Sequence, residues 1–119
     1  MDAPASRPVR ARTVAECLEA PAHAGALDGA ERVGEAASEG RVVRVGVWRN
    51  GPVLRARFRA STCASLIAYA EAACQALEAG ARPDADALRA LVVGVHPRHL
   101  ERADVVAAAV RAALTPEPA

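Results

Sequence analysis

Residues 41–60 read RVVRVGVWRNGPVLRARFRA, and this stretch decides the fold. Apolar residues alternate along both halves, which are separated by Asn50-Gly51, the dipeptide that most favours a type I′ hairpin turn. We therefore predict an antiparallel hairpin whose loop is closed by Arg49 and Pro52. The other inward pairs predicted are Val47 with Leu54, Val45 with Ala56, and Val43 with Phe58. Because all six of these residues are apolar and share one face, that face is expected to be buried.

The opposite face of the predicted hairpin is basic. It carries Arg44, Trp48, Arg55, Arg57 and Arg59. The predicted register sets Arg44 directly opposite Arg57, and like charges at that spacing repel each other. Free solvent or an anionic partner is therefore expected on this side of the sheet.

Helical periodicity replaces alternation outside the hairpin. The predicted helices cover Val14 to about Ala20, Cys63 to Ala79, Pro83 to about Val93, and about Arg98 to Leu114. Thr13 and Glu16 form a capping box for the first helix, and Gly80 ends the second helix. A Gly-rich and Ala-rich connection is expected from His23 to about Gly40. This order predicts an α+β fold in which helices cover one face of a small antiparallel sheet and leave the other face open.

Length and composition restrict the function classes. The 119 residues fit one domain, expected over residues 13–114, with disordered tails at residues 1–12 and 115–119. A net charge of +1 and 3% aromatic residues argue against a nucleic-acid binder. Apolar runs are too short for a membrane span. Three cysteines without a secretory signal indicate free thiols in a reducing compartment, hence a cytoplasmic protein.

Cys63 is the strongest candidate for chemistry. It stands where the second strand meets the long helix, and the free N–H groups and dipole of a helix N-terminus stabilise a thiolate. Cys74 lies on the apolar stripe of the same helix and is expected in the core, and Cys17 is expected to be structural or incidental. The histidines at 23, 96 and 99, taken singly, are expected to be surface or capped side chains. No CxxC, HExxH, GxSxG or phosphate-loop motif is present, which disfavours a self-contained hydrolase or nucleotide-binding protein.

Four stretches of the chain resemble, in the right order, the IscU/NifU N-terminal family of iron–sulfur cluster assembly scaffolds. Residues 14–27 align without a gap with V-I-x-H-Y-x-N-P-R-N-x-G-x-L, and Ala37-Ser38-Glu39 falls where the family has Cys-Gly-Asp. Residues 57–68 resemble R-F-x-x-x-G-C-x-S-x-x-A, with Thr62 in place of the glycine. The stretch from Pro97 to Arg111 resembles P-x-x-x-x-C.

The resemblance covers about residues 14–114 and implies a SufE/NifU-like fold and a scaffold rather than an enzyme. Family scaffolds assemble a [2Fe–2S] cluster on three cysteines and an aspartate. Cys63 matches the central cysteine and Glu39 the aspartate, whereas Ala37 and Arg102 stand at the other two cysteine positions. The resemblance also implies a cysteine desulfurase or other iron–sulfur assembly proteins as partners. We expect a monomer or weak dimer, with no nucleic acid and no membrane as partners.

The donor set leaves three functional hypotheses open. The first is a diverged scaffold that binds iron, a labile [2Fe–2S] cluster or zinc through Cys63 and Glu39, with His99 as a further candidate ligand. A cluster normally needs four donors, whereas zinc accepts a mixed thiolate, carboxylate and imidazole set. The second is a sulfur acceptor whose Cys63 takes a persulfide from a cysteine desulfurase. The third is a non-catalytic pseudo-scaffold that binds a partner through the arginine-rich sheet face.

Overall fold

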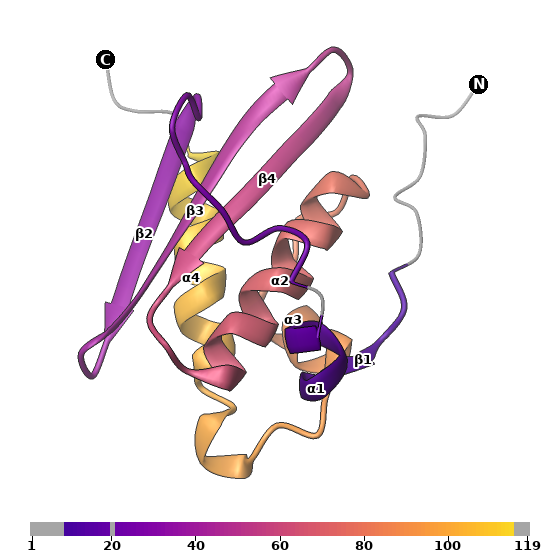
Figure 1. Ribbon diagram of the computed structural model, residues 1–119, viewed down its shortest axis with the longest axis vertical. Helices are drawn as coiled ribbons and strands as arrows, with labels where there is room; N and C mark the ends of the chain where they lie inside the picture. Colours follow the sequence, from indigo (N-terminus) through magenta and orange to yellow (C-terminus); the bar gives the residue numbers. More distant parts are fainter. Residues whose placement is uncertain (1–8, 20, 116–119) are drawn as a thin grey trace.

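The computed structural model describes residues 9–19 and 21–115, which form an α+β domain (Figure 1). The elements are β1 (Arg12–Thr13), α1 (Val14–Glu19), β2 (Arg32–Ser38), β3 (Arg41–Asn50), β4 (Val53–Ala60), α2 (Ala64–Glu78), α3 (Ala85–Leu91), β5 (Val92–Val93), the 3-10 turn η1 (Pro97–His99) and α4 (Arg102–Leu114). Strands β2, β3 and β4 form an antiparallel sheet in that order, and β1 pairs in parallel with β5. The predicted α+β class, with helices packed on a small antiparallel sheet, is therefore confirmed. Of the tails predicted at residues 1–12 and 115–119, residues 1–8 and 116–119 lie outside the described residues, and Arg12 already belongs to β1.

The inner face of the sheet is the one predicted from alternation. Val43, Val45, Val47, Ala56 and Phe58 are buried, and Leu54 is half-buried. Helices α2 and α4 cover this face, as Figure 1 shows, and contribute the other large part of the core. Half of the buried residues of α2 and α4 are alanines, which allow the helices to lie close to the sheet.

The register of the β3–β4 hairpin differs by two residues from the prediction. Val45 pairs with Phe58 and Arg44 with Arg59, and Asn50 and Val53 close a loop made of Gly51 and Pro52. The predicted closing pair of Arg49 and Pro52 is wrong because such a pair exchanges two N–H···O bonds and proline has no N–H. Since proline cannot adopt a positive φ, Gly51, with φ of 66°, occupies the first position of a type II′ turn rather than a type I′ turn.

Strand β2 was not predicted, because its sequence lacks the usual strand signal. Gly34, which faces the core, stands where a Cβ atom would come within 2.0 Å of the Ala109 carbonyl oxygen of α4. Backbone therefore packs directly on backbone there, and no large apolar residue marks the buried side of the strand. The turn to β3 consists of Glu39 and Gly40, whose φ values of 53° and 77° are typical of a type I′ turn.

The other sheet face is not open, contrary to the prediction. The segment that joins α1 to β2 crosses this face, as Figure 1 shows. Leu27 packs on Gly46, where an added Cβ atom would lie 3.0 Å from the leucine side chain. Arg44 is paired with Glu35 at 2.6 Å, so part of the basic surface is neutralised within the sheet.

The helix boundaries agree with the prediction except at the last helix. The capping box of α1 is present: Thr13 N–H donates to Glu16 Oε1 at 2.9 Å, and Glu16 N–H donates to Thr13 Oγ1 at 3.1 Å. Gly80, with φ of 95°, follows the end of α2. Helix α4 begins at Arg102 rather than near Arg98, because His96 to Leu100 form a tighter turn with i→i+3 hydrogen bonds. None of the helices in the described ranges is long and apolar enough to cross a membrane.

Candidate functional site

Three segments meet at one end of the molecule, the lower end in Figure 1: the β4–α2 junction, η1 and the start of α4. The junction carries Cys63, η1 carries His99, and Arg102 is the first residue of α4. A hydrogen bond of 3.0 Å between Ser65 Oγ and His99 Nδ1 joins η1 to the first turn of α2. Residues far apart in sequence are thus assembled around the N-terminus of the longest helix.

Cys63 is the N-cap residue of α2, with extended backbone and a half-buried side chain. Its thiol makes no capping hydrogen bond of ordinary geometry. Burial raises the pKa of the thiol, but the N–H of Leu66, the guanidinium of Arg102 and the N–H of Ser65 together outweigh burial and lower the pKa below its usual value. The predicted tendency of this cysteine to ionise is therefore supported by its surroundings.

Arg102 is a buried cation beside this thiol. Its side chain is 8% exposed, and one terminal nitrogen is paired with Glu101. Its Nε has no hydrogen-bond partner among the described residues. A buried charge that is only partly paired is costly, so the guanidinium favours an anion next to it, and Cys63 supplies one when its thiol ionises. The family resemblance marks Arg102 only as a position where a cysteine ligand is missing. Its position beside Cys63 was not predicted.

The other predicted site residues are divided between this end and the turn before β3. His99 is held by Ser65, and its pKa is lowered by burial and by the charges of Arg102, His96 and Arg41. The Glu39 side chain is 73% exposed in the β2–β3 turn and pairs with Arg41 at 3.9 Å. Ala37 lies on β2 and offers no donor.

These residues fit a metal ion poorly as they stand. Within residues 9–19 and 21–115, no three His, Cys, Asp or Glu side chains are grouped so that they could hold a metal. The cation nearest the thiol is a buried guanidinium, which repels a second cation at the same place. Cys63, Glu39 and His99 would need to move together, with Arg102 displaced, before zinc or a cluster could be ligated.

The two remaining cysteines are structural, as predicted. Cys17 and Cys74 are fully buried, and neither forms a disulfide. Burial raises the pKa of Cys17 and raises that of Cys74 far more. Cys63 is thus the one cysteine of this chain whose surroundings favour the thiolate.

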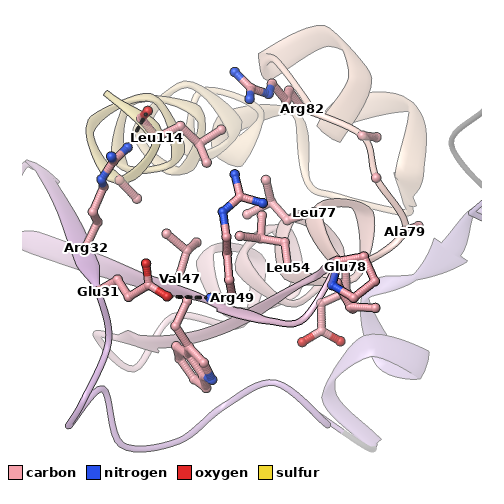
Figure 2. Close-up of a pocket in the computed structure, with 16 residues that line it drawn as sticks. Glu31, Arg32, Val47, Arg49, Leu54, Leu77, Glu78, Ala79, Arg82 and Leu114 are labelled. Carbon is pink, nitrogen blue, oxygen red and sulfur yellow. Dashed lines mark hydrogen bonds between the residues drawn. The ribbon is translucent and has the colours of Figure 1, made fainter. Parts of the chain in front are cut away.

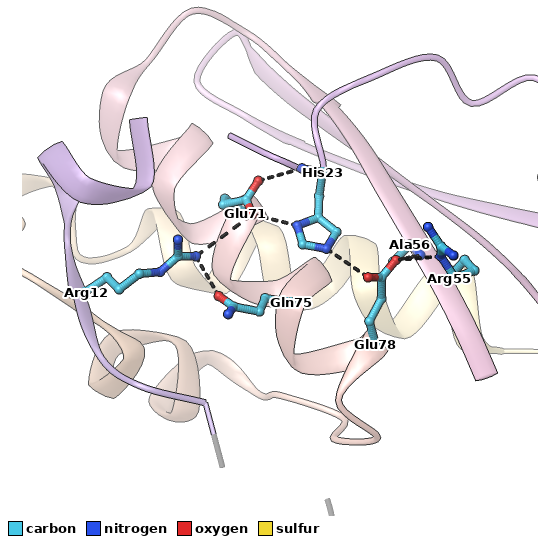
Figure 3. A network of polar contacts seen from close by, with 7 residues as sticks. All are labelled: Arg12, His23, Arg55, Ala56, Glu71, Gln75 and Glu78. Carbon is cyan, nitrogen blue, oxygen red and sulfur yellow. Dashed lines mark hydrogen bonds and ion pairs between the residues drawn. The ribbon is translucent and has the colours of Figure 1, made fainter. Parts of the chain in front are cut away.

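A second polar cluster lies along α2, on the side that faces β1 and β4 (Figure 3). His23 donates its backbone N–H to Glu71 Oε1 at 2.9 Å, and its ring lies 2.6 Å from Glu71 Oε2 and 3.0 Å from Glu78 Oε1. Arg12 donates to Gln75 at 2.6 Å and lies 3.9 Å from Glu71. Glu78 also accepts the N–H of Ala56 in β4 at 2.9 Å.

The charged groups of this cluster pair with one another. The Glu71 hydrogen bond raises the pKa of His23, burial opposes it, and Glu78 adds to the rise. Burial raises the pKa of Glu78, but the N–H of Ala56 and the His23 ring outweigh burial and lower it. His23 was predicted to be a surface or capped histidine, whereas it joins two carboxylates on a buried helix. The spacing of Glu71, Gln75 and Glu78, one polar stripe on an otherwise apolar helix, was the sequence signal for it.

The end of the molecule that carries Cys63 and Arg102 is therefore the better candidate for chemistry, since a half-buried thiol with a lowered pKa is a nucleophile. The His23 cluster satisfies its own charges and holds three segments together. Comparison with known proteins assigns no family, because no protein-family model matches the chain and a search of curated proteins finds no match.

Proposed function

We propose that this protein is a sulfur acceptor in iron–sulfur cluster assembly, with Cys63 taking a persulfide sulfur from a cysteine desulfurase. The observation that carries the proposal is the pairing of a half-buried, low-pKa thiol with the buried guanidinium of Arg102. The resemblance to the IscU/NifU N-terminal family supplies the biological setting. The finer SufE/NifU-like fold assignment is part of the same proposal.

The transfer step needs one nucleophilic sulfur and no metal. The Cys63 thiolate attacks the terminal sulfur of the desulfurase persulfide, so a new S–S bond forms at Cys63 Sγ. The S–S bond within the donor breaks, and the donor cysteine leaves as a thiolate that takes up a proton. Oxidation states are exchanged between the two cysteines, and no outside oxidant or reductant is required. Arg102 stabilises the attacking thiolate and then the persulfide anion that replaces it.

Donor count favours this step over permanent cluster ligation. A [2Fe–2S] cluster is usually held by four thiolates, whereas this chain keeps one cysteine at the family's three ligand positions. Persulfide transfer uses one thiol that a partner can reach, and Cys63 is not fully buried. A scaffold that holds a labile cluster, and a pseudo-scaffold that binds without accepting sulfur, are the outcomes that the test below distinguishes.

The test is transfer of sulfur to the native protein. We expect incubation with a cysteine desulfurase and L-cysteine to increase the intact mass by one sulfur atom, and peptide mapping to place that sulfur on Cys63. Cys63→Ala should abolish the increase, whereas Cys74→Ala should retain it, because Cys74 is fully buried. Arg102→Met should slow transfer at neutral pH and recover at higher pH, where the thiol ionises without help.

Three results would overturn the proposal. The first is sulfur on Cys74 or Cys17 in place of Cys63. The second is no mass increase with a panel of desulfurases, which leaves the pseudo-scaffold. The third is stoichiometric iron and sulfide in wild-type protein after anaerobic reconstitution, lost in Cys63→Ser and Glu39→Ala, which would restore the scaffold hypothesis.

A further inference from the structure

A cavity lies at the end of the sheet opposite Cys63, next to the β3–β4 hairpin (Figure 2). Its volume is about 470 Å³, within the range of small-molecule sites. The hairpin, the end of α2 and the end of α4 all contribute to its wall. The apolar part of the lining includes Trp48 and Val53 of the hairpin, together with Val47, Leu54, Leu77 and Leu114.

Three arginines stand around this apolar lining. Figure 2 shows Arg49 extending into the middle of the space, with Arg32 and Arg82 on other sides. Arg32 donates to the Leu114 carbonyl oxygen at 3.2 Å. The guanidinium groups of Arg49 and Arg82 have no partner within the part of the chain that the structure describes. Both are exposed cations that make no ion pair within the described residues.

The two carboxylates in the lining do not supply those counter-charges. Glu31 accepts the backbone N–H of Arg49 at 2.8 Å. This hydrogen bond is made to the strand backbone and not to the guanidinium group. Glu78 is used by His23, by the N–H of Ala56 and by Arg55 at 3.4 Å. Neither carboxylate forms an ion pair with Arg49 or Arg82 among the described residues, so both guanidinium groups are available to an anionic ligand.

We propose that this cavity binds a small amphipathic anion, a carboxylate or phosphate carried on a hydrocarbon or aromatic group. The headgroup lies between Arg49 and Arg82, whose planar guanidinium groups suit both kinds of oxyanion. The apolar group lies on Leu54 and Leu114, the half-buried leucines of the lining. The site is independent of sulfur transfer, because it shares no residue with the Cys63 end.

The binding test uses probes that share one chain and differ in headgroup. Calorimetry with octanoate and octyl phosphate below their micelle concentrations should show saturable binding, and the tighter of the two identifies the preferred headgroup. Trp48, the only tryptophan, lines the cavity, so its fluorescence gives a second readout. Acetate should bind at least tenfold more weakly than octanoate, and octyltrimethylammonium should not compete with it.

Matched arginine variants locate the site. Arg49→Gln and Arg82→Gln should each weaken octanoate binding roughly tenfold, as loss of one charge-assisted hydrogen bond predicts. Arg98→Gln makes the same change in charge at an exposed position outside the cavity and should bind like wild type. Unchanged affinity in the Arg49→Gln/Arg82→Gln double variant would overturn the proposal. So would equal binding of octyltrimethylammonium, or no binding of either anion at millimolar concentration.

Discussion

Two charged side chains are almost fully buried in the described part of this protein, and their surroundings differ. The Glu71 side chain is 2% exposed and both of its oxygens are engaged, by the backbone and ring of His23 and by Arg12. The Arg102 side chain is 8% exposed, and its Nε has no partner among the described residues. The charge of Glu71 is compensated by His23 and Arg12, whereas the guanidinium of Arg102 lies beside the Cys63 thiol. We infer that Glu71 stabilises the architecture and that Arg102 serves chemistry.

Loss of Glu71 should have the largest effect. Glu71→Ala leaves the His23 ring and its N–H without their main partner, and breaking a buried ion pair costs about 3–5 kcal/mol. Urea unfolding near pH 6 measures the free energy of unfolding. If Glu71→Ala does not fold, Glu71→Gln, which keeps the shape of the side chain without its charge, is measured instead. Glu35→Ala, which removes the exposed partner of Arg44, should cost less than about 1 kcal/mol. Equal costs at positions 71 and 35 would contradict the comparison.

The His23 cluster should also give stability a pH dependence. Because the folded pKa of His23 is raised above its ordinary value of 6.5, its contribution is complete below pH 6.5 and is lost as pH rises through the folded pKa. The free energy of unfolding should therefore fall more between pH 6 and pH 9 in wild type than in His23→Gln. At pH 6 this variant should be less stable by roughly 2 kcal/mol, the scale of hydrogen bonds to charged groups. Parallel pH profiles for the two proteins would show that His23 is not charged in the fold.

Replacement of Arg102 should separate stability from reactivity. Arg102→Met replaces an incompletely paired buried charge with an apolar chain, so the free energy of unfolding should change by less than about 1 kcal/mol or increase. The pKa of Cys63 should rise, because two of the influences that lower it come from Arg102. The pH dependence of iodoacetamide alkylation, mapped to Cys63 by mass spectrometry, measures that rise. A large loss of stability with unchanged alkylation would assign Arg102 the same structural role as Glu71.

The smallest effect is expected at Tyr69. Its side chain is fully buried, and its hydroxyl has no hydrogen-bond partner among the described residues. Tyr69→Phe removes an unsatisfied polar group and should leave stability unchanged or raise it by up to about 1 kcal/mol. Thermal unfolding of the two proteins gives the difference. Destabilisation by more than about 1 kcal/mol would reveal a hydrogen bond to the hydroxyl.

The buried and exposed faces of the hairpin could be read from alternation, because Val43, Val45 and Phe58 follow a strict period of two. The register could not be read from the Asn50-Gly51 dipeptide alone. This dipeptide favours a type I′ turn closed by Arg49 and Pro52, but Pro52 lacks the N–H that such a closing pair needs. Strand β2 was missed because Gly34 is the residue that packs on α4, and a glycine in a strand gives no apolar signal. Local turn chemistry thus decided the register, whereas tertiary contact decided the place of β2.

The candidate site was predictable only in part. The position of Cys63 at a helix start follows from local sequence, and so does its tendency to ionise. The contribution of Arg102 depends on how α4 docks beside α2, which no local pattern encodes. The same is true of His23, whose two carboxylate partners lie 48 and 55 residues away in sequence. Long-range pairs of this kind need the fold before they can be recognised.

The segment that carries His23 also determines how this protein can self-associate. Phe58 N–H donates to the His23 carbonyl oxygen at 2.9 Å, and Gly25 N–H donates to the Phe58 carbonyl oxygen at 3.1 Å. With Ala56 N–H bonded to Glu78, the outer edge of β4 is occupied where another chain would otherwise add a strand. The other edge of the sheet is β2. It carries the exposed charged residues Arg32 and Glu35, and charges on an edge strand disfavour pairing with a strand of another molecule. The segment that carries His23, together with Glu78 of α2, therefore also covers the middle of the β4 edge.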